Sequence, residues 1–523
     1  MKKLILLITL VSFTVQAQDL TVSSGKSFTV GEAGSVQIYG DLTNNGTFTL
    51  NSDSNEFASL LVSGAASGDI IYNRYVNIEG TGEWDLIGAP VSNMAFSSLI
   101  TDANIATNGS DFAVGAYDNT TDTWTNATAA TVNQPGIYAG NLALGQGYQM
   151  ATTGGGTLSF AGAIANGDQP VTITNNDAAN SGAGRRWNLI ANPFASYLNG
   201  NSSADPEDET NNFLTVNAAA IDDAFEAIYG WKADGTGYAI YNHTFNNNSA
   251  VYIAPGQGFF LAAAGSGGAQ TITFTKAMQT VTGVDDFVAA RSSASYELVL
   301  EMYSDAVKVA DTKFYFKEGL TLGLDPGYDA GAFNQSSGFS SRLLEQDSGI
   351  GMGINAMPID AMSNVIVPLV VHQQAGISLK IQIANSTIPE DINVYLEDTI
   401  ENTFTLLTNE SFELLAQTTL SGLGRFFLHY STSTLSTDTV SSTSLVSAYK
   451  GTGNTYISIE GLQQFSQPAN LTLYNVLGMK VLSRKIQNPS QKEMFSTVGM
   501  RAGVYILKVQ AENIVFTKKI VIE

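Results

Sequence analysis

The stretch WDLIGAP at residues 84–90 returns as WNLIANP at residues 187–193, and this repetition decides the fold that the sequence predicts. Two further pairs recur downstream in the same order: YDNTTDTW (117–124) with WKADGTGY (231–238), and GQGYQM (145–150) with GQGFFL (256–261). A Gly-rich turn and a strand-like segment follow each of the last two motifs. Three matches in one order predict two copies of a β module, at residues 81–176 and 177–290.

The aromatic residues of these motifs have two interpretations. Aromatic and aliphatic residues that alternate at strand spacing are typical of side chains that face a core, so we expect burial. The alternative is a platform of flat rings on which a sugar stacks. Burial or exposure of Tyr117, Trp124, Trp231 and Tyr238 distinguishes these hypotheses.

The first residues of the chain, MKKLILLITLVSFTVQAQDL, have the pattern of a secretory signal peptide. Two lysines precede an apolar run from Leu4 to Val15, and the small Ala17 stands at a suitable cleavage point, so we assign residues 1–17 to this peptide. The run is shorter than the ~20 residues that span a bilayer. No later segment is long and apolar enough, and we expect no transmembrane helix in the mature form.

The other regions also read as β structure. Residues 18–80 hold short alternating runs broken by Gly or Asn, which predicts a short solenoid-like or meander region. Residues 291–430 hold longer alternating runs, which predicts a β-sandwich. A Ser/Thr-rich linker at 431–445 precedes a separate domain at 446–523. The predicted fold class is therefore all-β and multidomain, built from β-sandwich modules.

Composition excludes several functional classes. The chain of 523 residues carries a formal charge of −23, and such a surface repels phosphate backbones, so we expect no nucleic-acid partner. Cysteine is absent, which excludes disulfides, thiol catalysis and cysteine-ligated metals.

The last domain resembles a known family. LTLYNVLGMKVLSRKI at 471–486 and GMRAGVYILKVQAENIVFTKKIVIE at 499–523 resemble the type A C-terminal sorting domain of Bacteroidetes type IX secretion cargo. Met479 stands where the family commonly has Gln, and AENIVF lacks the usual glycine of the last hairpin. The resemblance implies an immunoglobulin-like domain whose sorting signal includes Tyr474, Gly478, Gly503, Tyr505, Lys508, Lys518 and Lys519.

The resemblance also implies a route. The type IX secretion machinery is the expected partner, and the protein is expected in the medium or at the cell surface, reached through the periplasm and across the outer membrane. In this family the sorting domain is commonly cleaved, and some cargo stays attached to surface lipopolysaccharide. Residues 471–523 hold 8 Lys and Arg against 3 Asp and Glu, whereas residues 19–470 hold 14 against 44. We expect the three lysines of the signal at strand edges or on the solvent face.

One further resemblance lies in the linker. The triplet Asp438–Val440 resembles the acceptor of O-linked glycans in Bacteroidetes, which implies a glycan on Thr439.

Catalytic residues are not evident. None of the three histidines, His243, His372 and His429, lies in a recognised catalytic context. His372 and His429 lie at the ends of predicted strands, where we expect a hydrogen-bonded structural role. A polysaccharide hydrolase needs two carboxylates that flank a sugar, and Glu79, Glu83 and Asp85 near Trp84 are candidates. The alternative, solvated charges at a strand edge, stays open.

Calcium is the small partner with the best-matched donors, because its hard oxygen ligands are plentiful in acidic loops. The alternative of solvated or turn-capping loops stays open. The candidate ligands are Asp118, Asp122, Asp205, Asp208, Asp325 and Asp329, with Asn119 and Glu209 beside them.

The leading hypothesis is an exported, non-enzymatic β protein that acts in adhesion or binds a glycan or another envelope component. One alternative is a secreted polysaccharide hydrolase with paired carboxylates. The other is a structural stalk or coat protein.

Overall fold

The structure is a computed structural model of the full chain. It describes residues 14–78, 84–132, 134, 136–177, 185–232, 237–243, 249–265, 268–283, 296–335, 338–432, 447–449, 456–465, 468–475, 480–487, 492–501, 503–511 and 514–522. The chain divides into two compact units: Met1–Phe245 with Ser249–Ser292, and Asn246–Asn248 with Ser293–Glu523. We describe each unit by itself.

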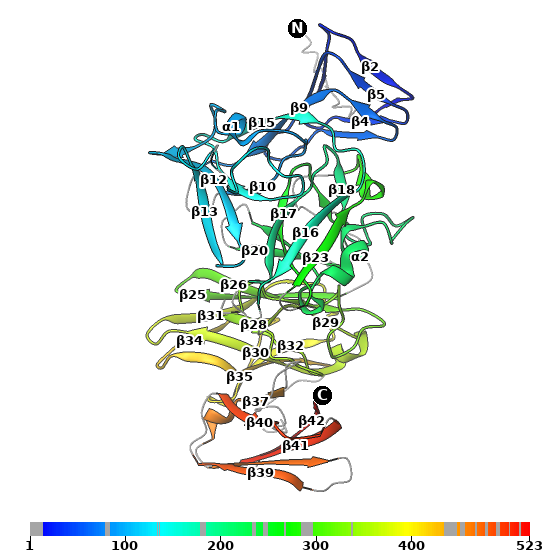
Figure 1. The fold of residues 1–523 in the computed structure, drawn as a ribbon. Helices are drawn as coiled ribbons and strands as arrows, with labels where there is room; N and C mark the ends of the chain where they lie inside the picture. Colours follow the sequence, from blue (N-terminus) through cyan, green and yellow to red (C-terminus); the bar gives the residue numbers. More distant parts are fainter. Residues whose placement is uncertain are drawn as a thin grey trace, which may run out of the picture. The chain divides into compact units, whose positions relative to one another are not determined.

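The first unit begins with a parallel β-solenoid of three coils, drawn in blue in Figure 1. Each coil of the full chain contributes one short strand to each of three parallel sheets, with orders β1-β4-β7, β2-β5-β8 and β3-β6-β9. The first strand, β1, falls within residues 1–17, which the sequence assigns to the signal peptide. This parallel pairing decides for the solenoid over the meander. The strands are β1 (Thr14–Ala17), β2 (Leu20–Val22), β3 (Ser27–Val30), β4 (Ser35–Ile38), β5 (Leu42–Asn44), β6 (Thr47–Asn51), β7 (Ser59–Val62), β8 (Ala66–Ser67) and β9 (Asp69–Val76).

Alternation along these strands places apolar side chains inside the solenoid, as in β4, where Val36 and Ile38 are buried. Gly68 has φ +88°, and a Cβ there would collide with the carbonyl oxygen of Asn44, so the turn requires glycine. β9 pairs antiparallel with β15 (Gly156–Ala163) along eight residues and so joins the solenoid to the following region.

Two antiparallel sheets with matching strand orders follow the solenoid. The first has the order β10-β14-β12-β11, with β13 also paired to β12; the second has the order β17-β22-β19-β20. Their strands are β10 (Asp85–Ile87), β11 (Thr107–Asn108), β12 (Asp111–Asp118), β13 (Thr123–Thr128) and β14 (Tyr148–Met150), then β17 (Trp187–Ala191), β19 (Ile228–Trp231), β20 (Tyr238–Tyr241) and β22 (Gly258–Ala262).

The two sheets are joined by reciprocal contacts of their Gly-Gln-Gly turns. The amide of Gly88 donates to the carbonyl of Gly256 at 2.8 Å, and the amide of Ala191 donates to the carbonyl of Gly145 at 2.9 Å. Each turn therefore binds the end of the Trp-led strand in the opposite sheet.

The remaining elements of this unit complete its layers. β16 (Gln169–Asn175), from the predicted first module, pairs along seven residues with β23 (Gly268–Phe274) of the predicted second one. A small sheet has the order β21-β18-β24, and two short helices contact β15 and β23. These elements are β18 (Tyr197–Asn199), β21 (Tyr252–Ile253), β24 (Gln279–Thr280), α1 (Phe96–Leu99) and α2 (Phe213–Asn217).

The second unit contains one long sheet and the terminal domain. The sheet has the order β33-β32-β35-β30-β28-β29-β26-β25-β31-β34, with β27 on β29. Its strands are β25 (Tyr296–Ser304), β26 (Val307–Phe316), β27 (Ala330–Gly331), β28 (Phe339–Ser341), β29 (Met352–Met357), β30 (Asn364–Gln373), β31 (Ser378–Ser386), β32 (Asn393–Asp398), β33 (Thr403–Leu406), β34 (Phe412–Leu415) and β35 (Leu420–Ser431).

This sheet folds over to enclose one core. β26 and β35 are separated by three strands in the sheet, yet the rings of Phe314 and Tyr430 lie 6.1 Å apart. The predicted sandwich is thus two layers of one continuously hydrogen-bonded sheet. We refer to residues 296–432 as the sandwich.

The terminal domain has two sheets, with orders β36-β37-β40 and β39-β38-β41-β42. Both sheets contribute to one apolar core, for example Ile457 from the first and Leu471 and Leu507 from the second. These two sheets form the domain that the resemblance assigns to sorting. Its strands are β36 (Ser447–Tyr449), β37 (Tyr456–Glu460), β38 (Ala469–Asn475), β39 (Lys480–Ile486), β40 (Lys492–Ser496), β41 (Gly503–Ala511) and β42 (Ile514–Ile522).

The all-β, multidomain fold class is confirmed. Within the described ranges, no helix has the length and apolar character needed to cross a membrane.

Candidate functional site

Two aromatic pairs occupy corresponding places in the two matching sheets. Tyr117 faces Trp124 across β12 and β13, and Trp231 faces Tyr238 across β19 and β20. Their ring centroids lie 5.4 and 5.0 Å apart. Phe260 contacts both pairs edge to face, at 5.0 Å from Tyr117 and 5.5 Å from Tyr238. Such offset and edge contacts are the stable geometries of aromatic rings.

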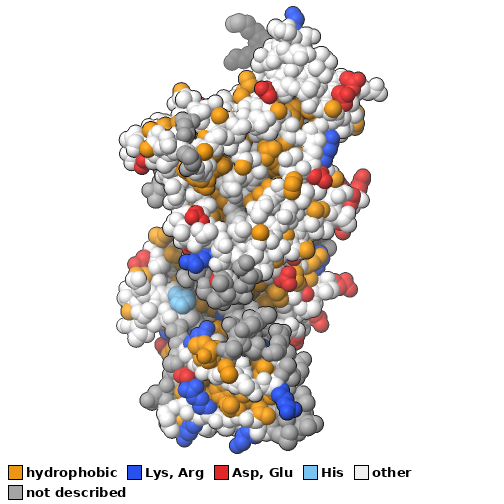
Figure 2. Space-filling model, viewed as in Figure 1, with side chains coloured by type: hydrophobic (Ala, Val, Ile, Leu, Met, Phe, Trp, Pro, Cys, Tyr) orange, Lys and Arg blue, Asp and Glu red, His pale blue; other side chains and the backbone are white. Residues whose placement is uncertain are grey.

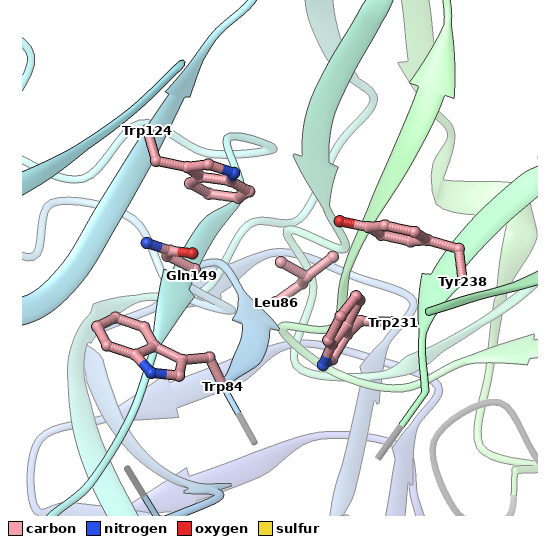
Figure 3. A pocket seen from close by; sticks show the side chains of 6 residues that line it. All are labelled: Trp84, Leu86, Trp124, Gln149, Trp231 and Tyr238. Carbon is pink, nitrogen blue, oxygen red and sulfur yellow. The ribbon is translucent and has the colours of Figure 1, made fainter. Parts of the chain in front are cut away.

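Members of both pairs line an open pocket of about 370 Å³. In Figure 3, Trp84, Gln149 and Trp124 stand on one side, Trp231 and Tyr238 stand on the other, and Leu86 lies between. The lining residues therefore come from β10, β13, β14, β19 and β20, with Trp84 directly before β10. Pockets with aromatic walls and few polar groups are typical small-ligand sites.

The expectation that these aromatic side chains lie in the core holds only in part. Trp124 is 37% exposed, and Tyr117, Trp231 and Tyr238 are partly exposed. The corresponding expectation holds for Trp187, which is buried against Phe225 and Tyr229.

The polar groups of the pocket are neutral. The Gln149 amide nitrogen donates to the Asn126 side-chain oxygen at 3.2 Å, which orients the amide. Burial raises the pKa of Tyr238 well above its ordinary value, so the phenol keeps its proton. None of the six lining side chains carries a charge.

Of the carboxylate candidates near Trp84, the structure describes Asp85. Asp85 accepts hydrogen bonds from the backbone and side-chain nitrogens of Asn77, both at 2.8 Å, and this contact ties β10 to the end of β9. Glu79 and Glu83 lie outside the described residues.

Carboxylates proposed as calcium ligands accept hydrogen bonds within their own loops. Asp118 accepts from the backbone and hydroxyl of Thr120, which with further loop hydrogen bonds lowers its pKa. Asp122, with φ +58°, accepts from the Tyr117 hydroxyl at 2.7 Å. Asp205 accepts from the amides of Glu207 and Asp208.

The other three calcium candidates also accept hydrogen bonds from protein donors. Asp208 accepts from Thr210, and Asp325 accepts from Thr321. Asp329 is fully buried and accepts from the amides of Asp325 and Ala356, both at 2.7 Å; burial raises its pKa to about 8. Among the described residues, no three acidic or histidine side chains form a group that could hold a metal ion.

The histidines have structural partners. Nε2 of His429 lies 2.7 Å from a Glu397 oxygen within the long sheet. Nδ1 of His243 lies 3.0 Å from the Ser202 hydroxyl. Nδ1 of His372 lies 3.4 Å from the Ser421 hydroxyl, and burial lowers the His372 pKa.

The predicted sorting residues that the structure describes lie on three neighbouring strands of one sheet, β38, β41 and β42. Tyr474 is in β38, Gly503, Tyr505 and Lys508 are in β41, and Lys518 and Lys519 are in β42. Tyr505 is buried, and its hydroxyl donates to the carbonyl of Arg501 at 2.9 Å. Lys518 lies on β42, an edge strand of its sheet, in agreement with one of the two expected positions. Its Nζ donates to the carbonyl of Leu344 in the sandwich at 2.8 Å. Gly478 and Thr439 lie outside the described residues.

Charge is distributed unevenly. Lys and Arg side chains gather over the sorting domain on the face shown in Figure 2, in agreement with its excess of basic residues.

Comparison with known proteins supports the assignment of the sorting domain. A family described as Secretion system C-terminal sorting domain matches residues 451–523, which confirms the prediction of a type IX secretion cargo delivered to the cell surface or the medium. No curated protein matches the chain.

One solved structure is similar over part of its length, the crystal structure of dimeric latent PorU from Porphyromonas gingivalis. The similarity has 11% sequence identity and a TM-score of 0.15, and it covers 44% of this chain and 29% of that chain. The chain thus spans less than a third of that protein.

A second family, described as Domain of unknown function (DUF8693), matches residues 5–430, which is well over half of the chain. The protein therefore belongs to the DUF8693 family and carries a type IX secretion sorting domain at residues 451–523.

Proposed function

We propose that the protein is an exported binding protein whose aromatic pocket takes a neutral saccharide. The observation that carries this proposal is the lining of the pocket: three indole rings, a phenol and a side-chain amide around a volume of about 370 Å³. Such a protein would act in adhesion or bind a component of the cell envelope.

The chemistry of the lining matches a sugar. The face of an aromatic ring is electronegative, and the C–H bonds on the flat face of a pyranose are weakly positive, so the two attract each other. Gln149 offers both a donor and an acceptor to hydroxyl groups. An uncharged lining gives no counter-ion to an acidic or amino sugar, which favours a neutral one.

We infer that the two matching sheets are copies of one module and that the pocket arises where the copies differ. GQGYQM and GQGFFL align Gln149 of the first copy with Phe260 of the second. Phe260 packs against aromatic rings from both copies, whereas Gln149 lies beside open space. Replacement of a large ring by an amide at this place opens the site and supplies its polar group.

The lining also favours binding over hydrolysis. Hydrolysis of a glycosidic bond requires an acid and a second carboxylate or its equivalent, and no lining side chain is a carboxylate. Secretion by the type IX route places the protein where surface and extracellular glycans are present.

The test is a retention screen of the mature protein on neutral oligosaccharides, with the Gln149→Phe variant beside the wild type. Phenylalanine copies the residue of the second module and fills the pocket, so retention should be lost while the melting temperature stays the same. The absence of retention on every saccharide contradicts the proposal, as does equal retention by the variant.

A further inference from the structure

The sandwich and the sorting domain meet through one face of the β36-β37-β40 sheet. Alternation along β36 turns Ala448 into the core of the sorting domain and turns Ser447 and Tyr449 to the opposite face. Glu460 of β37 pairs with Ser447 and with Lys492 of β40, so it shares that face. The strand that follows the linker therefore presents its polar side to the sandwich.

The opposing surface of the sandwich is the segment between β28 and β29. Its centre is Arg342, which is only 4% exposed. The guanidinium binds the Asp347 carboxylate through Nε at 3.2 Å and Nη2 at 3.0 Å. This fork-like geometry is the strong form of an arginine–carboxylate pair.

The sorting domain completes the surroundings of this arginine. The Tyr449 ring lies 4.7 Å from the guanidinium carbon, and a Glu460 oxygen lies 3.9 Å from Nη1. The Ser447 hydroxyl donates to Asp347 at 3.4 Å. Burial lowers the pKa of Arg342, but the Asp347 and Glu460 carboxylates more than offset this and hold its pKa above the ordinary value.

Charges alternate through the contact. Asp347, Arg342, Glu460 and Lys492 follow one another, and Nζ of Lys492 lies 3.4 Å from Glu460. The cluster therefore has no net charge, which lowers the cost of its burial.

Three contacts extend the interface beyond this cluster. Lys518 donates to the carbonyl of Leu344, and Gln463 donates to the carbonyl of Leu423 at 3.2 Å. Gly349 lies so close to the Tyr449 ring that a Cβ would approach it to 2.2 Å. Side chains from β36, β37, β42 and the segment after β37 thus all bind the sandwich.

We propose that the Arg342 segment is a docking surface for the sorting domain and that the two domains stay associated after the linker at 431–445 is cut. A cut in this linker then produces a non-covalent complex, and release of the sorting domain requires a separate undocking step. Away from the Arg342 cluster, the same face of the β36-β37-β40 sheet carries Tyr456 and Met494. These two side chains are 43% and 50% exposed.

The test uses the full chain with a specific protease site placed in the linker. After cleavage at micromolar concentration, size-exclusion chromatography should return both fragments in one peak, and dilution should yield a dissociation constant. Glu460→Gln removes the charge that faces Arg342 and should weaken association about tenfold. Tyr449→Ala removes the ring beside the guanidinium and should weaken it at least as much.

Tyr456→Ala is the matched control, because this tyrosine lies on the same face of the same sheet away from the cluster. It should leave the dissociation constant unchanged. The thermal unfolding of each uncut variant shows whether its sorting domain is folded, and the conservative Glu460→Gln change keeps the test valid if Tyr449→Ala unfolds. Separation of the wild-type fragments overturns the proposal, as does equal association of wild type and Glu460→Gln.

Discussion

Trp124→Ala removes part of the pocket wall, and the resulting loss of binding free energy can be calculated from the exposed surface of this tryptophan. A tryptophan side chain has roughly 250 Å² of surface, and 37% of Trp124 is exposed. A ligand can therefore cover roughly 90 Å² of the indole. At ~25 cal/mol per Å² of apolar surface this is about 2 kcal/mol, or about a thirtyfold increase in the dissociation constant.

Titration calorimetry with a saccharide retained by the wild type measures this loss. Trp124 lies on β13, whose pairing partner is β12, so its removal should leave the fold intact. Tyr39→Ala is the control, because Tyr39 is 52% exposed on the solenoid of the same unit. An unchanged affinity in Trp124→Ala, or an equal loss in Tyr39→Ala, refutes the assignment of the pocket.

Four other predictions follow from the structure. Trp187→Ala removes a buried ring and should destabilise the first unit by about 3–5 kcal/mol in denaturant unfolding; a loss below about 1 kcal/mol contradicts its place in the core. Burial, with a further contribution from Asp223, raises the pKa of Glu226 from 4.5 to about 7, so the folded chain binds this proton more tightly than the unfolded chain does. The stability that the protonated group contributes is therefore full below pH 4.5 and is lost as the pH rises to about 7. Glu226→Gln should flatten that decline by roughly 2 kcal/mol in unfolding curves across this range, and an unchanged pH profile refutes it. Chelation with EDTA should leave the melting temperature unchanged, because the six candidate carboxylates already accept hydrogen bonds from protein donors; a clear fall in the melting temperature would favour bound calcium. Deletion of residues 446–523 should trap the protein in the periplasm in fractionated cells, and normal delivery to the surface contradicts the sorting assignment.

Much of the fold follows from short-range pattern. Short alternating runs broken by Gly and Asn predict a solenoid or a meander, since strands of three to five residues need a turn after each; the parallel pairing that distinguishes the two is not visible in the sequence. The paired motifs around Trp84 and Trp187 predict two sheets of similar strand order. What pattern does not predict is the pairing of β16 with β23, because hydrogen bonding between distant strands leaves no local signal.

The site was harder to predict for a physical reason. Aromatic residues at strand spacing suit a core and a pocket wall equally well, and the choice depends on which strands lie opposite. One signal was available: Trp124 stands in TWTNAT, where Thr and Asn occupy both faces of the strand. Such a strand buries little, so its tryptophan was a candidate for exposure. Gln149 could be recognised as a lining residue only by aligning GQGYQM with GQGFFL, which places it opposite Phe260.

In the sorting domain, too, sequence pattern does not predict a contact that depends on distant residues. Lys518 stands on a strand with alternating apolar residues, and that pattern predicts a solvent-facing lysine. The contact with Leu344 depends on the docking of two domains, which no periodicity within one strand encodes.

The most direct test of the account is a tryptophan fluorescence titration of the mature protein with a neutral oligosaccharide. The chain has four tryptophans; Trp84, Trp124 and Trp231 line the pocket, and Trp187 is buried. The emission therefore reports mainly on the pocket, with a constant background. We expect a saturable blue shift that is absent from Gln149→Phe. An emission spectrum that no neutral saccharide changes, or a shift that persists in Gln149→Phe, would contradict it.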